Sequence, residues 1–266
     1  STTGAPKRSN AQPIIAHGDN GLTIAMGHNG NVINAAPLRT ELEEWGSNFT
    51  GTSDTEVIAE MYAKAPGTTW EERSAYAMRR LKGAYSLVIM TKDQLVGVRD
   101  PLGIRPLCIG KFGDGYILAS ESCAIDHVGG EFIREIEPGE TVVIDENGME
   151  SFMWSGTKEG HAMCIFEHIY FARPDSILDG RLTHISRTNM GMALARQLFA
   201  FEGDMSAVSV MFWHRLIERI GRWMPGGFTL GQYLVLRLYQ APHEREELIE
   251  RRYLRHQFSQ PSGPFA

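Results

Sequence analysis

A chain of 266 residues with 42% hydrophobic and 22% charged residues has the composition of a globular protein, and it can bury one large core or two modest ones. The net charge of −6 gives no reason to expect nucleic acid as a partner, and no apolar run approaches the roughly 18 residues of a membrane span. The polar first residues predict no signal peptide. The odd number of cysteines fits the reducing cytoplasm better than a disulfide framework.

The first elements along the chain are predicted from a turn signal. Residues 21–34 are expected to form a hairpin of two short strands around Asn29-Gly30, because both residues tolerate positive φ. A helix is then predicted from Pro37 to Glu44.

Two more helices are predicted before the main run of strands. Ser53 and Glu56 have the spacing of a capping box, in which each side chain takes a free N–H group at the helix start. The apolar residues that recur at helical spacing behind this box are Val57, Ile58, Met61 and Tyr62. A further helix is expected from Trp70 to Leu81.

Several short apolar runs with Asp, Gly and Pro turns between them are typical of strands. The expected strands cover residues 84–90, 95–98, 107–109, 116–119 and 141–144. Helices followed by many strands predict packed antiparallel sheets with helices outside, which is an α+β architecture.

A second section begins near Ala162 with an apolar and aromatic run over residues 164–171. Ser186 is predicted to cap a helix, whose apolar face would carry Met190, Leu194, Leu198 and Phe201. Residues 204–266 contain eight arginines and no lysine. We interpret this tail as a packed amphipathic helix rather than a membrane-surface helix, because acidic residues balance the arginines.

The string His28-Asn29-Gly30-Asn31 has two interpretations. Taken alone, it is typical of a hairpin turn with polar ends. It also suits an oxyanion hole, in which an Asn side-chain N–H and a Gly backbone N–H point at the negative oxygen of a tetrahedral intermediate. Glycine leaves that approach open because it has no Cβ.

Asp54 also has two interpretations. It could be an acidic residue in the first turn of a helix, where the helix dipole favours it. It could instead be a carboxylate that holds the ammonium group of an amino-acid substrate.

Two further features carry weaker chemical signals. The string from Arg99 to Leu107 contains Asp-Pro-x-Gly, which is typical of a type I turn, and no catalytic role follows from it. Cys164 could be a core thiol or one ligand of an iron–sulfur cluster, which normally needs four cysteines. The chain has only Cys108 and Cys123 besides it, so a complete cluster is not expected within this chain.

The nine histidines lack the spacing of a metal site.

Nine strings, taken in order, resemble motifs of the amidophosphoribosyltransferases. They cover residues 1–4, 10–13, 28–31, 52–56, 81–86, 99–107, 119–122, 137–140 and 164–176, so the resemblance extends over roughly residues 1–200. The motifs near His28 and Ser53 are shared with other class II glutamine amidotransferases. The strings that end at Leu107 and Ser176 distinguish the amidophosphoribosyltransferases, which act in purine synthesis, from these other amidotransferases.

The resemblance implies a fold and a domain order. It implies an N-terminal-nucleophile hydrolase sandwich of four αββα layers, truncated at its N-terminus and followed by the start of an α/β phosphoribosyltransferase domain. The expected domains are a type 2 glutamine amidotransferase domain at 1–160, the phosphoribosyltransferase start at 161–203 and a divergent Arg/Trp-rich tail at 204–266.

The resemblance also implies an activity. The family hydrolyses glutamine through an N-terminal cysteine. The ammonia then displaces pyrophosphate from phosphoribosyl pyrophosphate to give 5-phosphoribosylamine, the first step of de novo purine (IMP) biosynthesis. Carried over by motif, Asn29 and Gly30 would form the oxyanion hole, Asp54 would bind the glutamine ammonium and Thr2 would line the glutamine pocket.

The chain departs from the family pattern in two places. The cysteine nucleophile and the arginine that grips the glutamine carboxylate are expected upstream of Ser1, and Ser1 is not expected to replace the nucleophile, because its string lies well inside the family's domain. The acidic loop that binds phosphoribosyl pyrophosphate is not found in the sequence. We therefore expect the chain as given to be an inactive fragment.

The remaining expectations concern the full-length protein. It would use Mg²⁺ at the phosphoribosyltransferase site, hold a [4Fe-4S] cluster with Cys164 as candidate ligand, form a homo-oligomer, and bind neither nucleic acid nor membrane. Two alternatives stay open. One is another class II glutamine amidotransferase, which is disfavoured because no sugar-isomerase or ATP-pyrophosphatase motif follows. The other is a non-catalytic glutamine-binding or scaffold module.

Overall fold

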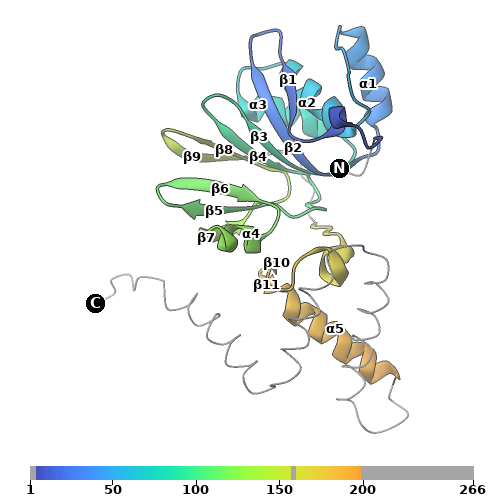
Figure 1. The fold of residues 1–266 in the computed structure, drawn as a ribbon, viewed down its shortest axis with the longest axis vertical. Coiled ribbons are helices and arrows are strands. Elements are labelled where there is room, and N and C mark those ends of the chain that lie inside the picture. Colours follow the sequence, from blue (N-terminus) through green and yellow to red (C-terminus); the bar gives the residue numbers. More distant parts are fainter. Residues whose placement is uncertain (1–3, 157–159, 199–266) are drawn as a thin grey trace. The chain divides into compact units, whose positions relative to one another are not determined.

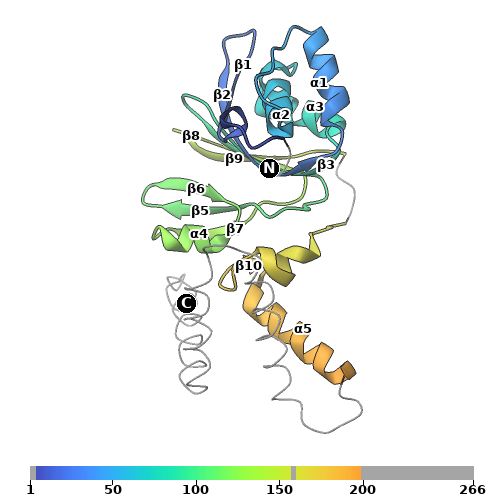
Figure 2. The same cartoon turned by 45° about the vertical axis from the view of Figure 1, so that its right-hand side comes forward.

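A computed structural model describes residues 4–156 and 160–198. The chain divides into two compact units, residues 1–189 and 190–266, and the sheets belong to the first. In this unit two antiparallel sheets stack face to face (Figures 1 and 2), with α1, α2 and α3 on the outer face of the larger sheet and α4 on the outer face of the smaller one. These are the four αββα layers that the resemblance implies.

The larger sheet contains six strands in the order β1-β2-β3-β4-β8-β9, and every neighbouring pair is antiparallel. Its strands are β1 (Ile14–His17), β2 (Thr23–Val32), β3 (Gly83–Met90), β4 (Leu95–Arg99), β8 (Glu140–Asp145) and β9 (Gly148–Met153).

The smaller sheet has the order β6-β5-β7 and lies between the larger sheet and α4. It consists of β5 (Cys108–Phe112), β6 (Gly115–Ala119) and β7 (Glu131–Glu135), with α4 at Ser122–His127. A short ribbon of β10 (Ile177–Leu178) and β11 (Arg181–Leu182) precedes α5 (Thr183–Leu198).

Two of the three helices on the larger sheet, α2 and α3, begin with a side-chain cap. Helix α3 (Trp70–Arg80) has a complete capping box, since Thr69 Oγ accepts from the Glu72 N–H and the Glu72 carboxylate accepts from the Thr69 N–H. Helix α1 spans Ala35–Glu44 and α2 spans Asp54–Lys64. At α2 only half of the predicted box forms, because Ser53 Oγ accepts from the Glu56 N–H while the Glu56 carboxylate accepts from the N–H groups of Thr50 and Gly51.

Alternation along the central strands builds two separate cores. On β3, Leu87 and Ile89 point into the core under the helices, whereas Val88 packs into the core between the sheets. On β8, Val143 and Val142 divide in the same way. Burial of each such side chain stabilises the fold by about 1.5–3 kcal/mol, so both faces of the larger sheet contribute to stability.

The predicted hairpin around Asn29-Gly30 is wrong. Both residues lie inside β2, where Asn29 pairs with Ser86 and Gly30 pairs with Tyr85 of β3. The hairpin turn lies earlier, where the Gly21 N–H bonds the Gly18 carbonyl oxygen between β1 and β2. The long pairing of β2 with β3 outweighs the local turn preference of Asn-Gly, because strand propensity depends strongly on context.

The other predicted elements are present with small shifts. The five expected strands appear as β3, β4, β5, β6 and β8, and the three helices expected before them appear as α1, α2 and α3. Helix α5 begins at Thr183 rather than Ser186. Phe201 and the predicted tail helix lie outside the described residues. The predicted domain boundary between residues 160 and 161 stays a prediction. None of the described helices is long and apolar enough to cross a membrane.

Candidate functional site

The end of β2 carries backbone groups that β1 leaves uncovered. The Gln12 side chain accepts from the His28 N–H at 2.7 Å and donates to the His28 carbonyl at 3.0 Å, so the backbone groups of His28 face the β1 edge. Backbone groups of alternate residues on a strand point to the same edge. The Gly30 N–H therefore points to this edge too, beyond the start of β1, which first pairs at Ile14 with Met26.

Only glycine fits at residue 30. Its φ of +153° lies outside the range that L side chains favour. A Cβ atom there would collide with the Ala84 carbonyl oxygen and lie 2.8 Å from Nε2 of His28. The sequence thus places a glycine where the backbone must come close to its neighbours.

The Asn29 side chain lies on the other face of β2, toward the smaller sheet. Its Oδ1 atom accepts from Arg105 Nε at 3.1 Å and from Arg105 Nη2 at 2.9 Å, and its Nδ2 atom donates to Ser120 Oγ at 3.2 Å. A guanidinium group has only donors, so the atom that faces it must be the amide oxygen. The orientation of the Asn29 amide is therefore defined by its neighbours.

Asp54 is buried beside the same stretch of β2. Its Oδ2 atom accepts from the Val32 N–H at 2.9 Å, and its Oδ1 atom lies 3.8 Å from Nδ1 of His28. The His28 ring also contacts Thr55 Oγ1 at 3.2 Å. Burial lowers the pKa of His28, and the Asp54 carboxylate opposes this shift. The structure thus brings Asp54 next to the residues that flank Asn29 and Gly30.

The loop before α2 is fastened to the beginning of the described chain. The Ala5 N–H donates to Thr52 Oγ1 at 3.1 Å, and the Thr52 N–H donates to Asn10 Oδ1 at 2.7 Å. Gly4 packs against the backbone of Thr52. These contacts hold the turn that leads into Asp54. Thr2, the predicted pocket residue, lies outside the described residues.

The loop over residues 99–107 contains a turn and is held in place by hydrogen bonds from the buried side chains of Arg99 and Asp100. Arg99 is 2% exposed and donates to the backbone carbonyls of Gly103, Arg105 and Ile136. Asp100 is fully buried, and its carboxylate accepts from the N–H groups of Leu102 and Ile104. The predicted turn is confirmed by the bond from the Gly103 N–H to the Asp100 carbonyl at 2.9 Å.

This loop places Arg105 opposite Asn29, a relationship that the sequence analysis missed. The two residues are far apart in the sequence, and no spacing rule joins them. The available signal was the string itself, in which Arg99 and Asp100 precede a third charged residue after a predicted turn.

The cysteines do not form a metal site within residues 4–156 and 160–198. No group of three or more His, Cys, Asp or Glu side chains there could hold a metal ion. Cys164 is a half-buried free thiol, while Cys108 and Cys123 are buried. Burial raises the pKa of Cys108 to about 12, which keeps this thiol protonated and unreactive. The described donors therefore do not form a complete iron–sulfur site by themselves, and a cluster with Cys164 as one ligand stays a prediction for the full-length protein.

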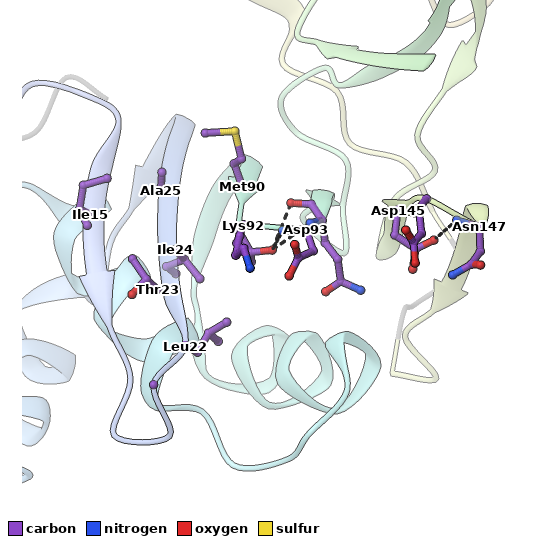
Figure 3. A pocket seen from close by; sticks show the side chains of 14 residues that line it. Ile15, Leu22, Thr23, Ile24, Ala25, Met90, Lys92, Asp93, Asp145 and Asn147 are labelled. Carbon is purple, nitrogen blue, oxygen red and sulfur yellow. Dashed lines mark hydrogen bonds between the residues drawn. The ribbon is translucent and has the colours of Figure 1, made fainter. Parts of the chain in front are cut away.

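An open depression of about 1090 Å³ lies at the other end of β2 (Figure 3). Strand ends and strand-connecting turns line it, and two of its polar side chains bond within their own turns: Asp145 Oδ1 accepts from the Asn147 N–H at 2.8 Å, and Thr91 Oγ1 accepts from the Asp93 N–H at 3.2 Å. Neither Asn29 nor Asp54 lines it. We place the candidate site at the Asn29 end of β2, where defined donors and a buried carboxylate come together.

The comparisons with known proteins agree with one another, since the matches are glutamine amidotransferases or amidophosphoribosyltransferases. Residues 4–127 match the model of a glutamine amidotransferase domain. The amidophosphoribosyltransferase of Archaeoglobus fulgidus is 46% identical over 201 residues, which are 74% of this chain and 43% of the relative. The Bacillus subtilis amidophosphoribosyltransferase is 41% identical over 204 residues, covering 77% of this chain and 42% of the relative.

Another relative matches further along the chain. The amidophosphoribosyltransferase of Staphylococcus aureus is 43% identical over 255 residues, covering 92% of this chain and 50% of the relative. Because 92% of the chain is aligned, this match must include part of residues 204–266. The chain spans half or less of the length of these three relatives.

Two solved structures share the fold. Glutamine phosphoribosylpyrophosphate amidotransferase from Bacillus subtilis, complexed with ADP and GMP, has a TM-score of 0.67 at 42% identity and covers 72% of this chain and 42% of its own. A structure described as the allosteric regulatory enzyme of purine biosynthesis has a TM-score of 0.69 at 40% identity and covers 75% and 43%. The described fold is therefore that of the N-terminal-nucleophile domain of these enzymes.

Proposed function

We propose that this chain is part of an amidophosphoribosyltransferase and supplies its glutamine-hydrolysing domain, because residues 4–127 match a glutamine amidotransferase domain and the chain resembles these enzymes in sequence and fold. In the full-length protein, hydrolysis of the glutamine side-chain amide releases glutamate and ammonia. The ammonia then displaces pyrophosphate from phosphoribosyl pyrophosphate and gives 5-phosphoribosylamine. The proposed compartment is the cytoplasm.

The observation that carries the proposal is the pair of donors at residues 29 and 30. Attack on an amide carbon places negative charge on its oxygen, and fixed N–H donors stabilise that charge without reorganising. The Asn29 amide has two N–H groups, and Ser120 takes one of them. We assign the second one, together with the Gly30 N–H, to the oxyanion.

Asp54 is proposed to bind the substrate ammonium. It is a carboxylate held in place by the Val32 N–H, next to the same end of β2. Thr2 is proposed as a second contact to glutamine. Attack on the amide is assigned to the family's N-terminal cysteine in the full-length protein. Mg²⁺ at the transferase site and a cluster with Cys164 as a ligand remain predictions for that protein.

The test uses the full-length protein that contains this chain. Pyrophosphate release from phosphoribosyl pyrophosphate and Mg²⁺ is measured with glutamine and, separately, with ammonium chloride. We expect release with both nitrogen sources. Asn29→Ala should lower the glutamine-dependent kcat on the order of a hundredfold and spare the ammonia-dependent rate, which bypasses the oxyanion hole. If Asn29→Ala lowered both rates equally in a folded protein, Asn29 would be a structural residue and the proposed role would be wrong.

The same assay separates the two rivals. Another class II amidotransferase would hydrolyse glutamine without releasing pyrophosphate from phosphoribosyl pyrophosphate. A non-catalytic module would bind glutamine and release neither ammonia nor pyrophosphate.

A further inference from the structure

Arg105 contacts two residues that lie far from it in the sequence. On one side its Nε and Nη2 atoms donate to Asn29 Oδ1. On the other side its Nη1 atom lies 2.7 Å from Glu167 Oε1, and its guanidinium carbon lies 5.0 Å from the centre of the Phe171 ring. Glu167 is 2% exposed, so this ion pair is shielded from solvent on its acidic side.

We propose that Arg105 is a positioning residue for glutamine hydrolysis, because it fixes the Asn29 amide with its nitrogen toward the oxyanion. Glu167 and Phe171 in turn hold the Arg105 guanidinium in place. This inference rests on the proposed function of Asn29.

The chemistry of the contact requires arginine. A guanidinium is planar and presents its N–H groups as a fixed fork, which here engages one amide oxygen with two donors. A lysine ammonium could keep the charge opposite Glu167 but would lose the fork and the stacking on Phe171. The Arg105 backbone is fixed as well, since its carbonyl accepts from Ser86 Oγ and from Arg99 Nε, each at 3.0 Å.

The nitrogen end of the Asn29 amide is tied to the same distant segment. Ser120, which accepts from Asn29 Nδ2, is followed by Glu121, whose carboxylate accepts from Ser176 Oγ at 2.6 Å and from the Arg173 N–H at 2.8 Å. The oxygen end of the amide is thus held by Arg105, which pairs with Glu167, and the nitrogen end by Ser120, whose neighbour Glu121 bonds to Arg173 and Ser176. This arrangement fixes the amide more tightly than a single contact would.

The first measurement uses the full-length enzyme. Arg105→Lys should lower kcat for glutamine hydrolysis about tenfold or more and leave KM for glutamine within about threefold, because the amide acts in the transition state rather than in binding. Turnover with ammonia should stay unchanged. Glu167→Gln removes the anchoring charge and leaves Arg105 intact, so it should reduce kcat in the same direction by a smaller factor.

A matched control is available in the same chain. Arg134 pairs with the buried Glu140 between β7 and β8, with Nη2 and Oε1 2.6 Å apart, and contributes nothing to the Asn29 contacts. Arg134→Lys should leave kcat for glutamine within about twofold. An equal loss in Arg134→Lys and Arg105→Lys would show a general effect of disturbed ion pairs and would overturn the inference.

A double-mutant cycle distinguishes failure of this inference from failure of the proposed function. In an Asn29→Ala background, Arg105→Lys should cause no further loss of kcat, since its target is gone. If Asn29→Ala has its expected effect and Arg105→Lys changes kcat by less than twofold, only the positioning role fails. If Asn29→Ala itself leaves glutamine hydrolysis unchanged, the proposed function fails.

A spectroscopic readout on the 266-residue chain needs no activity. The side-chain Nδ2H₂ resonances of Asn29, assigned by their loss in Asn29→Asp, should shift and exchange faster with solvent in Arg105→Lys but not in Arg134→Lys. Unchanged resonances in a folded Arg105→Lys chain would overturn the positioning role.

Discussion

The Asp54 carboxylate accepts a hydrogen bond from the Val32 N–H at 2.9 Å, which fastens the first residue of α2 to the end of β2. The proposed substrate contact is therefore also a structural contact. Substitutions at this residue must be chosen so that the two contributions can be measured separately.

Asp54→Asn keeps a side-chain oxygen for Val32 and removes the charge. We expect it to raise KM for glutamine roughly 10- to 100-fold in the full-length enzyme, because a charge-assisted contact to the ammonium is lost from the ground state. Asp54→Ala should raise KM similarly and also lower the free energy of unfolding by about 2 kcal/mol, since the Val32 N–H loses its acceptor. A KM that rises only in Asp54→Ala would assign Asp54 a purely structural role. Steady-state kinetics and urea denaturation provide the two measurements.

Gly30→Ala should destabilise the fold by about 2 kcal/mol or more, because both the +153° φ and the contact with the Ala84 carbonyl disfavour a Cβ atom. Gly27 in the same strand is the matched control, since a Cβ there would meet nothing closer than 3.8 Å. Gly27→Ala should fall between neutral and about 1 kcal/mol stabilising. Chemical denaturation of both variants tests the comparison, and equal stability would contradict it.

Asp100→Ala should destabilise the protein by about 2–5 kcal/mol. The part-buried Leu102 and Ile104 N–H groups lose the Asp100 carboxylate as acceptor, and each donor left unpaired costs about 1–3 kcal/mol. Asp100→Asn keeps one accepting oxygen and should cost roughly half as much. Urea midpoints at constant m-value give the difference, and two indistinguishable variants would show that the carboxylate does not support this loop.

The pH dependence of stability should contain a contribution from His28. Burial lowers the pKa of His28 in the folded state, so the unfolded chain takes up the proton more readily. The folded state should therefore lose stability as the pH falls below about 6.5 toward the lowered pKa, by at most about 1.4 kcal/mol per pH unit from this group.

The comparison for His28 uses two glutamine variants. His28→Gln should flatten the stability profile below pH 6.5 relative to the parent chain. The control is His17→Gln, because His17 is an exposed histidine that contacts Thr23 Oγ1 at 3.0 Å. Parallel profiles for all three proteins would rule out His28 as the source.

Local signals in the sequence were sufficient for elements with strong periodicity. Helix α2 follows from its cap and its apolar spacing, and β3 follows from its β-branched run. Strands β7 and β9 were missed because charged and polar residues interrupt their alternation, as in Glu131–Glu135. Only their pairing with β5 and β8 makes them strands.

The candidate site likewise has residues that local motifs predicted and contacts that only the folded chain shows. The motifs predicted Asn29, Gly30 and Asp54 as residues of one site, and the structure places them around one end of β2. Their roles stay predictions. The strand geometry of Asn29-Gly30 was wrong, because a turn signal is local and the pairing that overrides it is not. Arg105 was missed for the same reason, since it meets Asn29 and Glu167 only in the folded chain.

The order of strands in the larger sheet has a consequence for biosynthesis. The chain leaves this sheet after β4, builds the smaller sheet and α4, and returns as β8 to pair with β4. Residues 100–139 separate the two strands, so forty residues must be translated before β4 meets its partner. At about 5–20 residues per second this takes roughly 2–8 s. During that time the strand edge of β4 that later pairs with β8 is uncovered, and this unpaired edge exposes the nascent chain to aggregation.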